Sequence, residues 1–393
     1  MAHPLPLGFK YAGVACGIKK SGKPDLALIV ADQPAAAAGV YTQNVVHAAS
    51  IDWNRSLSPN SQLKGVIVNS GNANACTGEQ GVVDNRELAR LGAEAMDADI
   101  NQVLVLSTGI IGETLPMERI AVGAQTAGQH LNADSVAFER AASAIMTTDQ
   151  FAKTASRQWD SPQGTVTITG MAKGAGMIGP NMATMLCILT TDAAITPSDL
   201  DRSLRQAVNS SFNCVSVDGH TSTNDAVILM ASGKIPMSED DLSCFTQHLQ
   251  DTCIELAKLI PADGEGASHL IELIVAGTET DRDATVIAKT ISSSPLVKTA
   301  ITGADPNWGR IVSAAGYAGI PFDPQTTSLR INGTLIFSEG TPCSFDAASV
   351  SQSIAAARDV RVELQVGNGN GKARFWTSDL TVDYVKFNSD YHT

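Results

Sequence analysis

The stretch "KGAGMIGPNMATML", from Lys173 to Leu186, joins a glycine-rich turn to the start of an apolar run. The turn contains residues that favour tight or irregular backbone, namely Gly174, Gly176, Gly179 and Pro180. The continuation "MATMLCILTTD" has the composition of a buried strand. Thr184 opens this strand directly after the small residue Ala183. This arrangement raises the question of why a threonine stands at the junction between the turn and the strand.

Strand and helix patterns alternate irregularly on both sides of this junction. Strands are predicted at 25–32, 65–71, 102–109, 164–172, 226–232 and 270–277, and as a pair flanking "GNGNG" at Gly367–Gly371. Helices are predicted at 84–98, with Asp84 as N-cap, and at 138–146, 197–212 and 238–260. "QPAAAAG" is interpreted as a loop or helix start. Because no regular βαβ unit or repeat recurs, the pattern favours a layered α/β sandwich over a Rossmann sheet.

Composition and charge narrow the classes of function. The 393 residues are 44% apolar and 17% charged, which is typical of a globular chain. The net charge of -13 would repel a polyanion, so nucleic acid is not an expected partner. We find no secretory signal pattern and no apolar run long enough to span a membrane. The seven cysteines lack a C-x-x-C pair and the histidines lack metal-ligand spacing, which predicts a cytoplasmic protein without a metal site.

The chemistry of Thr184 depends on whether its amine is free. A threonine hydroxyl is a poor nucleophile until a base takes its proton, and one solution uses the residue's own α-amine, whose pKa is about 7.7 to 8.0. An internal threonine gains that amine only if its hydroxyl attacks the preceding carbonyl and the chain is cut there. The small Ala183 would leave space for this attack. From this segment alone, a β-branched residue filling a strand is the favoured alternative.

Three further features carry weak local signals. "STGIIG", from Ser107 to Gly112, is either a plain turn or an oxyanion site in which Thr108 and Gly109 donate hydrogen bonds to a tetrahedral intermediate. Lys173 is equally compatible with a solvated loop lysine. His220 with Asp218 and Ser222 could suggest a catalytic triad, but residues so close in sequence rarely converge in that geometry, and a loop histidine is favoured.

Many unusual stretches occur together in one order, and through them the chain resembles the ornithine acetyltransferase family of arginine biosynthesis, the bifunctional glutamate N-acetyltransferase type. The resemblance covers essentially the whole length. The stretches are "NSGNANACTG" (69–78), "STGIIG", "AIMTTD" (144–149), "KGAGMIGPNMATML", "SFNCVSVDGHTSTND" (211–225), "DGEGA" (263–267), "SPLVKTA" (294–300), "DPNWGR" (305–310) and "NSDYHT" (388–393). The resemblance implies an αββα sandwich that looks like N-terminal-nucleophile hydrolases with its own connectivity.

The resemblance also implies a role for individual residues. Self-cleavage between Ala183 and Thr184 would give an α chain, 1–183, and a β chain, 184–393, with Thr184 as nucleophile and Thr108 and Gly109 as the oxyanion pair. The implied substrate-contacting residues are Thr147, Lys173, Thr184, Glu265, Asn388 and Thr393. Lys173 would hold an α-carboxylate and Glu265 the ammonium group of ornithine. Without the resemblance, Glu265 is a turn residue, and Asn388 and Thr393 belong to a frayed tail.

The implied activity is acetyl transfer from N2-acetylornithine to glutamate through acetyl-Thr184, in a cytoplasmic heterotetramer of two α and two β chains. No metal or other cofactor is implied, although some relatives accept acetyl-coenzyme A as a donor and the sequence leaves this open. The alternatives are an N-terminal-threonine aminopeptidase or amidase, and a catalytically silent amino-acid-binding protein. Three positions depart from the family pattern, namely His220, His392 and Ser293.

Overall fold

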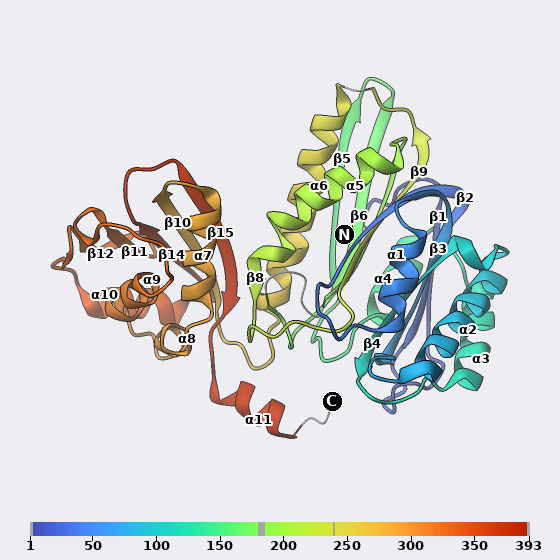
Figure 1. Cartoon of the computed structure of the whole chain (residues 1–393), viewed down its shortest axis with the longest axis horizontal. Helices are drawn as coiled ribbons and strands as arrows, with labels where there is room; N and C mark the ends of the chain where they lie inside the picture. Colours follow the sequence, from blue (N-terminus) through green and yellow to red (C-terminus); the bar gives the residue numbers. More distant parts are fainter. Residues whose placement is uncertain (1–2, 180–184, 239, 391–393) are drawn as a thin grey trace.

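Two hydrogen-bonded sheets organise the chain, and each belongs to one of the two lobes in Figure 1. The computed structural model describes residues 3–179, 185–238 and 240–390. The strands of the larger lobe are β1 (Phe9–Val14), β2 (Leu26–Tyr41), β3 (Asn60–Asn72), β4 (Val103–Ile110), β5 (Lys153–Ser161), β6 (Gly164–Lys173), β7 (Leu186–Ala193) and β9 (Ala226–Ile235). Its helices are α1 (Ala49–Leu57), α2 (Gly78–Met96), α3 (Met117–Gln129), α4 (Ser135–Ala144), α5 (Pro197–Asn209) and α6 (Asp241–Ala262).

Strand β2 connects the two halves of the larger sheet. The sheet has the order β4-β3-β2-β9-β7-β6-β5, and β1 also pairs with β2. The first half of β2 pairs with β1 and β3, and its second half pairs with β9 from Ala36 to Tyr41. The prediction of a loop or helix start at 33–39 was therefore wrong. Alanine favours helices in isolation, but here the small side chains of Ala35, Ala37 and Ala38 are buried where β2 crosses the core.

The two halves of the sheet face each other across an apolar layer. Residues from β3 and β4, such as Val66 and Leu106, share this layer with Ile188 of β7 and Ile228 of β9. The Tyr11 hydroxyl lies 2.8 Å from Thr190 Oγ1, so a hydrogen bond also joins β1 to β7. Helices α2 and α3 contact β1 to β4, whereas α5 and α6 contact the other half of the sheet (Figure 1). These layers confirm the predicted αββα sandwich.

The smaller lobe is built on a second mixed sheet with the order β13-β12-β11-β14-β10-β15-β8. Its strands are β8 (Val215–Ser216), β10 (Leu270–Thr278), β11 (Ser328–Ile331), β12 (Thr334–Ser338), β13 (Thr341–Pro342), β14 (Asp359–Gln365) and β15 (Gly371–Ser378). Its helices are α7 (Asp281–Ser292), α8 (Pro295–Thr302), α9 (Trp308–Gly316), α10 (Ala347–Ala356) and α11 (Val382–Asp390). The pair predicted around "GNGNG" forms β14 and β15, but β10 lies between them, so they are not a hairpin.

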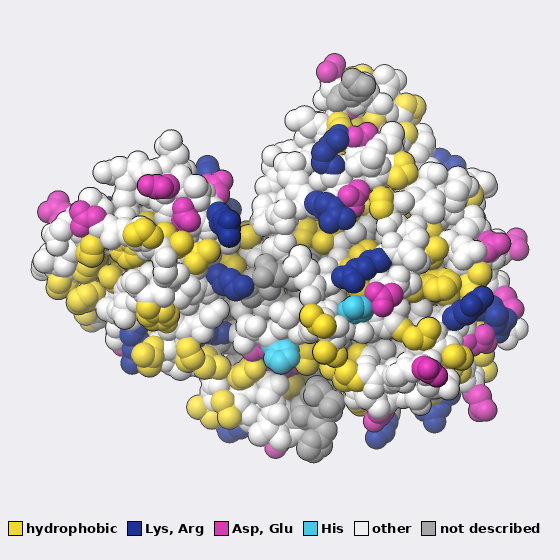
Figure 2. Space-filling view, viewed as in Figure 1, with side chains coloured by type: hydrophobic (Ala, Val, Ile, Leu, Met, Phe, Trp, Pro, Cys, Tyr) yellow, Lys and Arg dark blue, Asp and Glu magenta, His cyan; other side chains and the backbone are white. Residues whose placement is uncertain are grey.

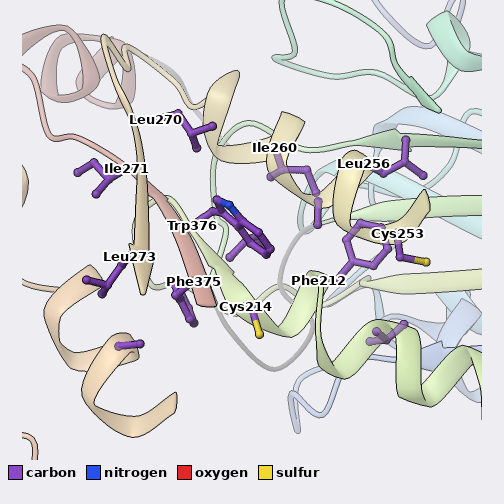
Figure 3. Close-up of a cluster of buried hydrophobic side chains, with 14 of the residues drawn as sticks. Phe212, Cys214, Cys253, Leu256, Ile260, Leu270, Ile271, Leu273, Phe375 and Trp376 are labelled. Carbon is purple, nitrogen blue, oxygen red and sulfur yellow. The ribbon is translucent and has the colours of Figure 1, made fainter. Parts of the chain in front are cut away.

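A continuous apolar core joins the two lobes. Figure 3 shows Ile260 of the larger lobe beside Trp376 of β15, with Phe212 and Leu256 farther into the larger lobe, and all four side chains belong to one buried cluster. Beside this junction a hollow lies between the lobes (Figure 2), lined among others by Gln206, Gln250, Asp281 and Arg374. Basic side chains on the face in Figure 2 are interspersed with acidic ones. Among the described residues, no helix is long and apolar enough to span a membrane.

The start of α2 differs from its prediction. The helix begins at Gly78, so Asp84 lies inside it and is not the N-cap. The Asp84 carboxylate instead accepts hydrogen bonds from Gln80 Nε2 at 2.7 Å and from the backbone N–H of Leu115 at 3.3 Å. Gly81 is buried in close contact with Asn74 and Thr77, where a larger side chain would not fit.

The contact between β1 and α4 can be tested at Gly13. A Cβ atom at this position would lie 2.2 Å from the Arg140 carbonyl oxygen, so Gly13→Ala must push the strand and helix apart. We expect the free energy of unfolding to fall by about 1–3 kcal/mol, the usual cost of overpacking, measured by urea denaturation. Gly316→Ala is the matched control, because a Cβ there meets no atom within 4 Å. Equal stability of the two variants would contradict this packing.

Candidate active site

A pocket of about 140 Å³ brings together predicted site residues from distant parts of the chain. Its walls come from the end of β4, the segment after α4, the end of β6, the segment 222–224, the turn after α6 and helix α11. The lining includes Thr108, Gly109, Thr147, Lys173, Glu265 and Asn388. A larger cavity of about 450 Å³ lies between β2, α1 and α5, but it is lined by none of these residues.

Three predicted residues lie outside the described part of the chain, namely Ala183, Thr184 and Thr393. Met185, which follows Thr184 in the sequence, is described and buried. Its backbone N–H donates to Asp225 Oδ1 at 2.8 Å. The next residue, Leu186, pairs with Lys173 across β6 and β7. The start of β7 is thereby fixed beside Lys173, which lines the pocket.

The predicted oxyanion pair stands at the end of β4. Gly109 has φ +136°, and a Cβ there would lie 2.2 Å from the carbonyl carbon of Gly71 in β3, so only glycine fits. Asn224 Nδ2 donates to the carbonyl oxygens of Ala73 and Ser107 at 2.7 and 2.9 Å, which ties the segment 222–224 to this strand end. The backbone that presents Thr108 and Gly109 is therefore fixed on both sides.

Lys173 is a buried cation at the end of β6. Its side chain is 2% exposed, which excludes the solvated-loop alternative. The Nζ atom lies 3.4 Å from Thr108 Oγ1, to which it donates. Burial lowers the pKa of Lys173, and the nearby carboxylates, Asp149 first among them, oppose this shift. Burial and the neighbouring carboxylates thus shift the pKa of this pocket lysine in opposite directions.

Asp149 is the carboxylate that organises this side of the pocket. Its Oδ1 accepts from Lys153 Nζ and from the Gly174 N–H, both at 2.6 Å, and its Oδ2 accepts from the Thr147 N–H at 2.9 Å. Burial alone would raise the pKa of Asp149, but Lys173, Lys153 and these hydrogen bonds outweigh burial and lower it from 3.8 to about 2. Lys153 Nζ also donates to Asp263 Oδ2 at 2.6 Å.

Glu265 is an acidic residue that lines the pocket. Thr148 Oγ1 donates to its Oε1 at 2.7 Å, and Asn388 Nδ2 donates to its Oε2 at 3.1 Å. A Cβ on Gly176 would lie 2.3 Å from Oε2, so this glycine makes room for the carboxylate. Burial raises the pKa of Glu265, and the two hydrogen bonds partly oppose the change. Glu265 is therefore a pocket residue held by three segments, and Asn388 contacts it from α11.

Some lining residues were not found from the sequence. Thr148, Met177, Ser222, Thr223 and Asn224 all line the pocket. Their motifs were recognised, but no pattern indicated which side chains would face inward. His220 is exposed, and the Asp218 carboxylate accepts backbone N–H bonds from Met177, Ile178 and His220. Asp218 thus fixes the glycine-rich turn and does not orient His220 in a triad.

Comparison with known proteins identifies the family. The family model described as "ArgJ family" matches residues 10–393. The chain belongs to the ArgJ family. The arginine biosynthesis bifunctional protein ArgJ of Rhodopirellula baltica is 50% identical over 406 residues, covering 100% of this chain and 97% of the relative. The protein of the same name from Gloeobacter violaceus is 43% identical, covering 98% and 96%.

A solved ArgJ structure agrees with this assignment. The crystal structure of arginine biosynthesis bifunctional protein argJ from Bacillus halodurans matches with a TM-score of 0.50 and 40% identity. The match covers 51% of this chain and 97% of the solved chain. Family membership confirms the resemblance inferred from the motifs, and it makes this protein an enzyme of the acetyltransferase type in arginine biosynthesis.

The Asp149–Lys153–Asp263 cluster can be tested through stability. Lys153→Met leaves two buried carboxylates without their shared cation, so we expect the free energy of unfolding at pH 7 to fall by about 3–5 kcal/mol. Lys20→Met, at an exposed position, is the control. Because the pKa of Asp149 is lowered from 3.8 to about 2, its contribution in the wild type is complete above the unfolded pKa and is lost as pH falls towards 2. Urea unfolding between pH 7 and 2 measures both effects, and a loss of under about 1 kcal/mol at pH 7 would contradict the cluster's role.

Proposed function

We propose that this protein transfers the acetyl group of N2-acetylornithine to glutamate through an ester on Thr184. The observation that carries the proposal is a pocket in which a cation, Lys173, and a carboxylate, Glu265, lie beside the strand end of Thr108 and Gly109. Both substrates are amino acids whose α-carboxylate suits Lys173. The names of the relatives support the same pathway.

The nucleophile would be created by self-cleavage between Ala183 and Thr184. The Thr184 hydroxyl attacks the Ala183 carbonyl, and water hydrolyses the resulting ester to give chains 1–183 and 184–393. The freed α-amine then serves as the base for the same hydroxyl. The proposal is supported by the anchored position of Met185, and by the solved relative whose chain corresponds to about half of this one.

The first half-reaction forms the acetyl ester. The Thr184 oxygen attacks the acetyl carbonyl, whose oxygen becomes an oxyanion facing the Thr108 hydroxyl and the Gly109 N–H. Because Thr108 Oγ1 accepts from Lys173 Nζ, its own hydrogen is available to the oxyanion. The bond from the carbonyl carbon to the ornithine nitrogen then breaks, and that nitrogen takes up the proton held by the Thr184 amine.

The second half-reaction reverses these steps with glutamate. The neutral amine of glutamate attacks the ester carbonyl and gives its proton to the base, the carbon–oxygen bond breaks, and the Thr184 hydroxyl is restored. N-acetylglutamate leaves.

We also propose that no metal or other cofactor takes part in the reaction. Two α and two β chains assemble in the cytoplasm under this proposal, without nucleic acid or membrane partners. An assay with acetyl-coenzyme A in place of acetylornithine determines whether it is a second donor.

Thr184→Ala tests self-cleavage. The wild-type protein should separate into two fragments of nearly equal size on denaturing electrophoresis, whereas Thr184→Ala should remain a single inactive chain because the attacking hydroxyl is gone. Thr184→Ser retains a hydroxyl and is the matched variant that should still cleave. A single full-length band from active wild-type protein would refute the cleavage.

Thr108→Ala tests the oxyanion role in fully cleaved enzyme. Loss of one donor should lower kcat by roughly 10²–10³-fold. Thr114→Ala, at an exposed position beyond β4, is the control and should retain wild-type kcat. If kcat of Thr108→Ala fell only a few-fold, Thr108 would be a turn residue without a role in stabilising the oxyanion. Omitting glutamate from the same assay separates the transferase from an amidase, which would release acetate at an undiminished rate.

A further inference from the structure

The side chains of the two proposed substrates carry opposite charges. If the proposed function holds, acetylornithine and glutamate bind in turn at one nucleophile, with their α-carboxylates towards Lys173. Beyond the shared amino-acid backbone, ornithine ends in an ammonium group and glutamate in a second carboxylate. Among the residues that the structure describes, the pocket lining offers one acidic side chain, Glu265, and one basic side chain, Lys173. With Lys173 at the α-carboxylates, an ionised Glu265 that binds the ammonium group would repel the carboxylate that follows it.

The hydrogen bonds of Glu265 fix its position in either charge state. Its oxygens accept from Thr148 Oγ1 and Asn388 Nδ2, and its backbone N–H donates to the Ala175 carbonyl at 2.9 Å. A protonated carboxyl can still accept both hydrogen bonds, and its one added hydrogen is then available to a bound ligand. The bare Cα of Gly176 lies against the carboxyl group. A change of charge therefore requires no movement of the side chain.

We propose that Glu265 determines specificity for both substrates by changing its protonation state within each catalytic cycle. Ionised Glu265 pairs with the ammonium group of acetylornithine. When glutamate enters, Glu265 takes one proton from solvent and donates it in a hydrogen bond to the side-chain carboxylate. The proton returns to solvent after N-acetylglutamate leaves, so the cycle is balanced. This inference rests on the proposed function.

The surroundings of Glu265 raise its pKa and so favour proton uptake. Burial raises its pKa, and Asp218, which precedes the segment 222–224, raises it further. The opposing groups are the hydrogen bonds from Thr148 and Asn388 and the cation Lys173 on β6. On α11, Tyr384 faces the same region, and burial, Asp218 and Glu265 raise the pKa of its hydroxyl to about 12, so it stays neutral. An incoming carboxylate adds a second negative charge and favours protonation still more.

Proton counting by calorimetry tests the inference directly. The cleaved enzyme is titrated with L-glutamate and with L-ornithine in buffers of different ionisation enthalpy; without an acetyl donor neither ligand turns over. Both ligands carry the same α-amine and α-carboxylate, so the difference between them isolates the side-chain site. Wild-type enzyme should take up about one proton more with glutamate than with ornithine. Glu265→Gln should abolish that difference, and Glu279→Gln, at an exposed position, should retain it.

Steady-state kinetics gives a second readout. Glu265→Gln keeps the size of the side chain and resembles its neutral form, so it should raise KM for acetylornithine about 10–100-fold and change KM for glutamate less than about threefold. A proton difference that persists in Glu265→Gln, or equal increases in both KM values, would overturn the inference. Failure of wild-type enzyme to release ornithine from acetylornithine would instead refute the proposed function, whereas the calorimetry, which needs no turnover, tests Glu265 separately.

Discussion

The buried carboxylate of Asp149 is the interaction on which the rest of the pocket depends. It lies just after α4 and accepts the backbone N–H of Thr147, while on the other side it accepts the N–H of Gly174, next to Lys173. It thereby joins the segment after α4 to the end of β6. A buried carboxylate is stable only with charged or hydrogen-bonding partners, and Lys153 supplies the cation. The same negative charge stabilises the protonated form of Lys173.

Close backbone packing gives the opposite wall its shape. The contact between Gly109 and Gly71 brings β3 and β4 together at their ends, and Asn224 ties the segment before β9 to the same place. Lys173 on one wall and the proposed oxyanion donors, Thr108 and Gly109, on the other therefore belong to neighbouring parts of one sandwich. Rigid placement of this kind is what electrostatic stabilisation of a developing oxyanion requires.

The sequence allowed the fold class and most pocket residues to be predicted, because several motifs occurred together. The position of Lys173 illustrates the limit of local reasoning. In isolation it resembled a solvated lysine, and the carboxylates that favour its charged form when it is buried, Asp149 first among them, are distant in the sequence. The strand through "QPAAAAG" was missed because alanine has low strand propensity, and its pairing with β9 is a contact between distant residues. Residues such as Thr148 could not be assigned because a loop has no periodicity that reveals which side chains face inward.

Helix α11 shows how far the pocket reaches along the chain. None of its residues is buried, and Figure 1 shows it extending from the smaller lobe, yet its Asn388 contacts Glu265.

In the proposed reaction, Thr184 carries the acetyl group as an ester after ornithine leaves and before glutamate takes it up. Intact-mass spectrometry of enzyme mixed with acetylornithine alone tests it most directly. The fragment 184–393 should gain the mass of one acetyl group and lose it when glutamate is added. An unmodified fragment, under conditions where added glutamate is converted to N-acetylglutamate, would contradict the account.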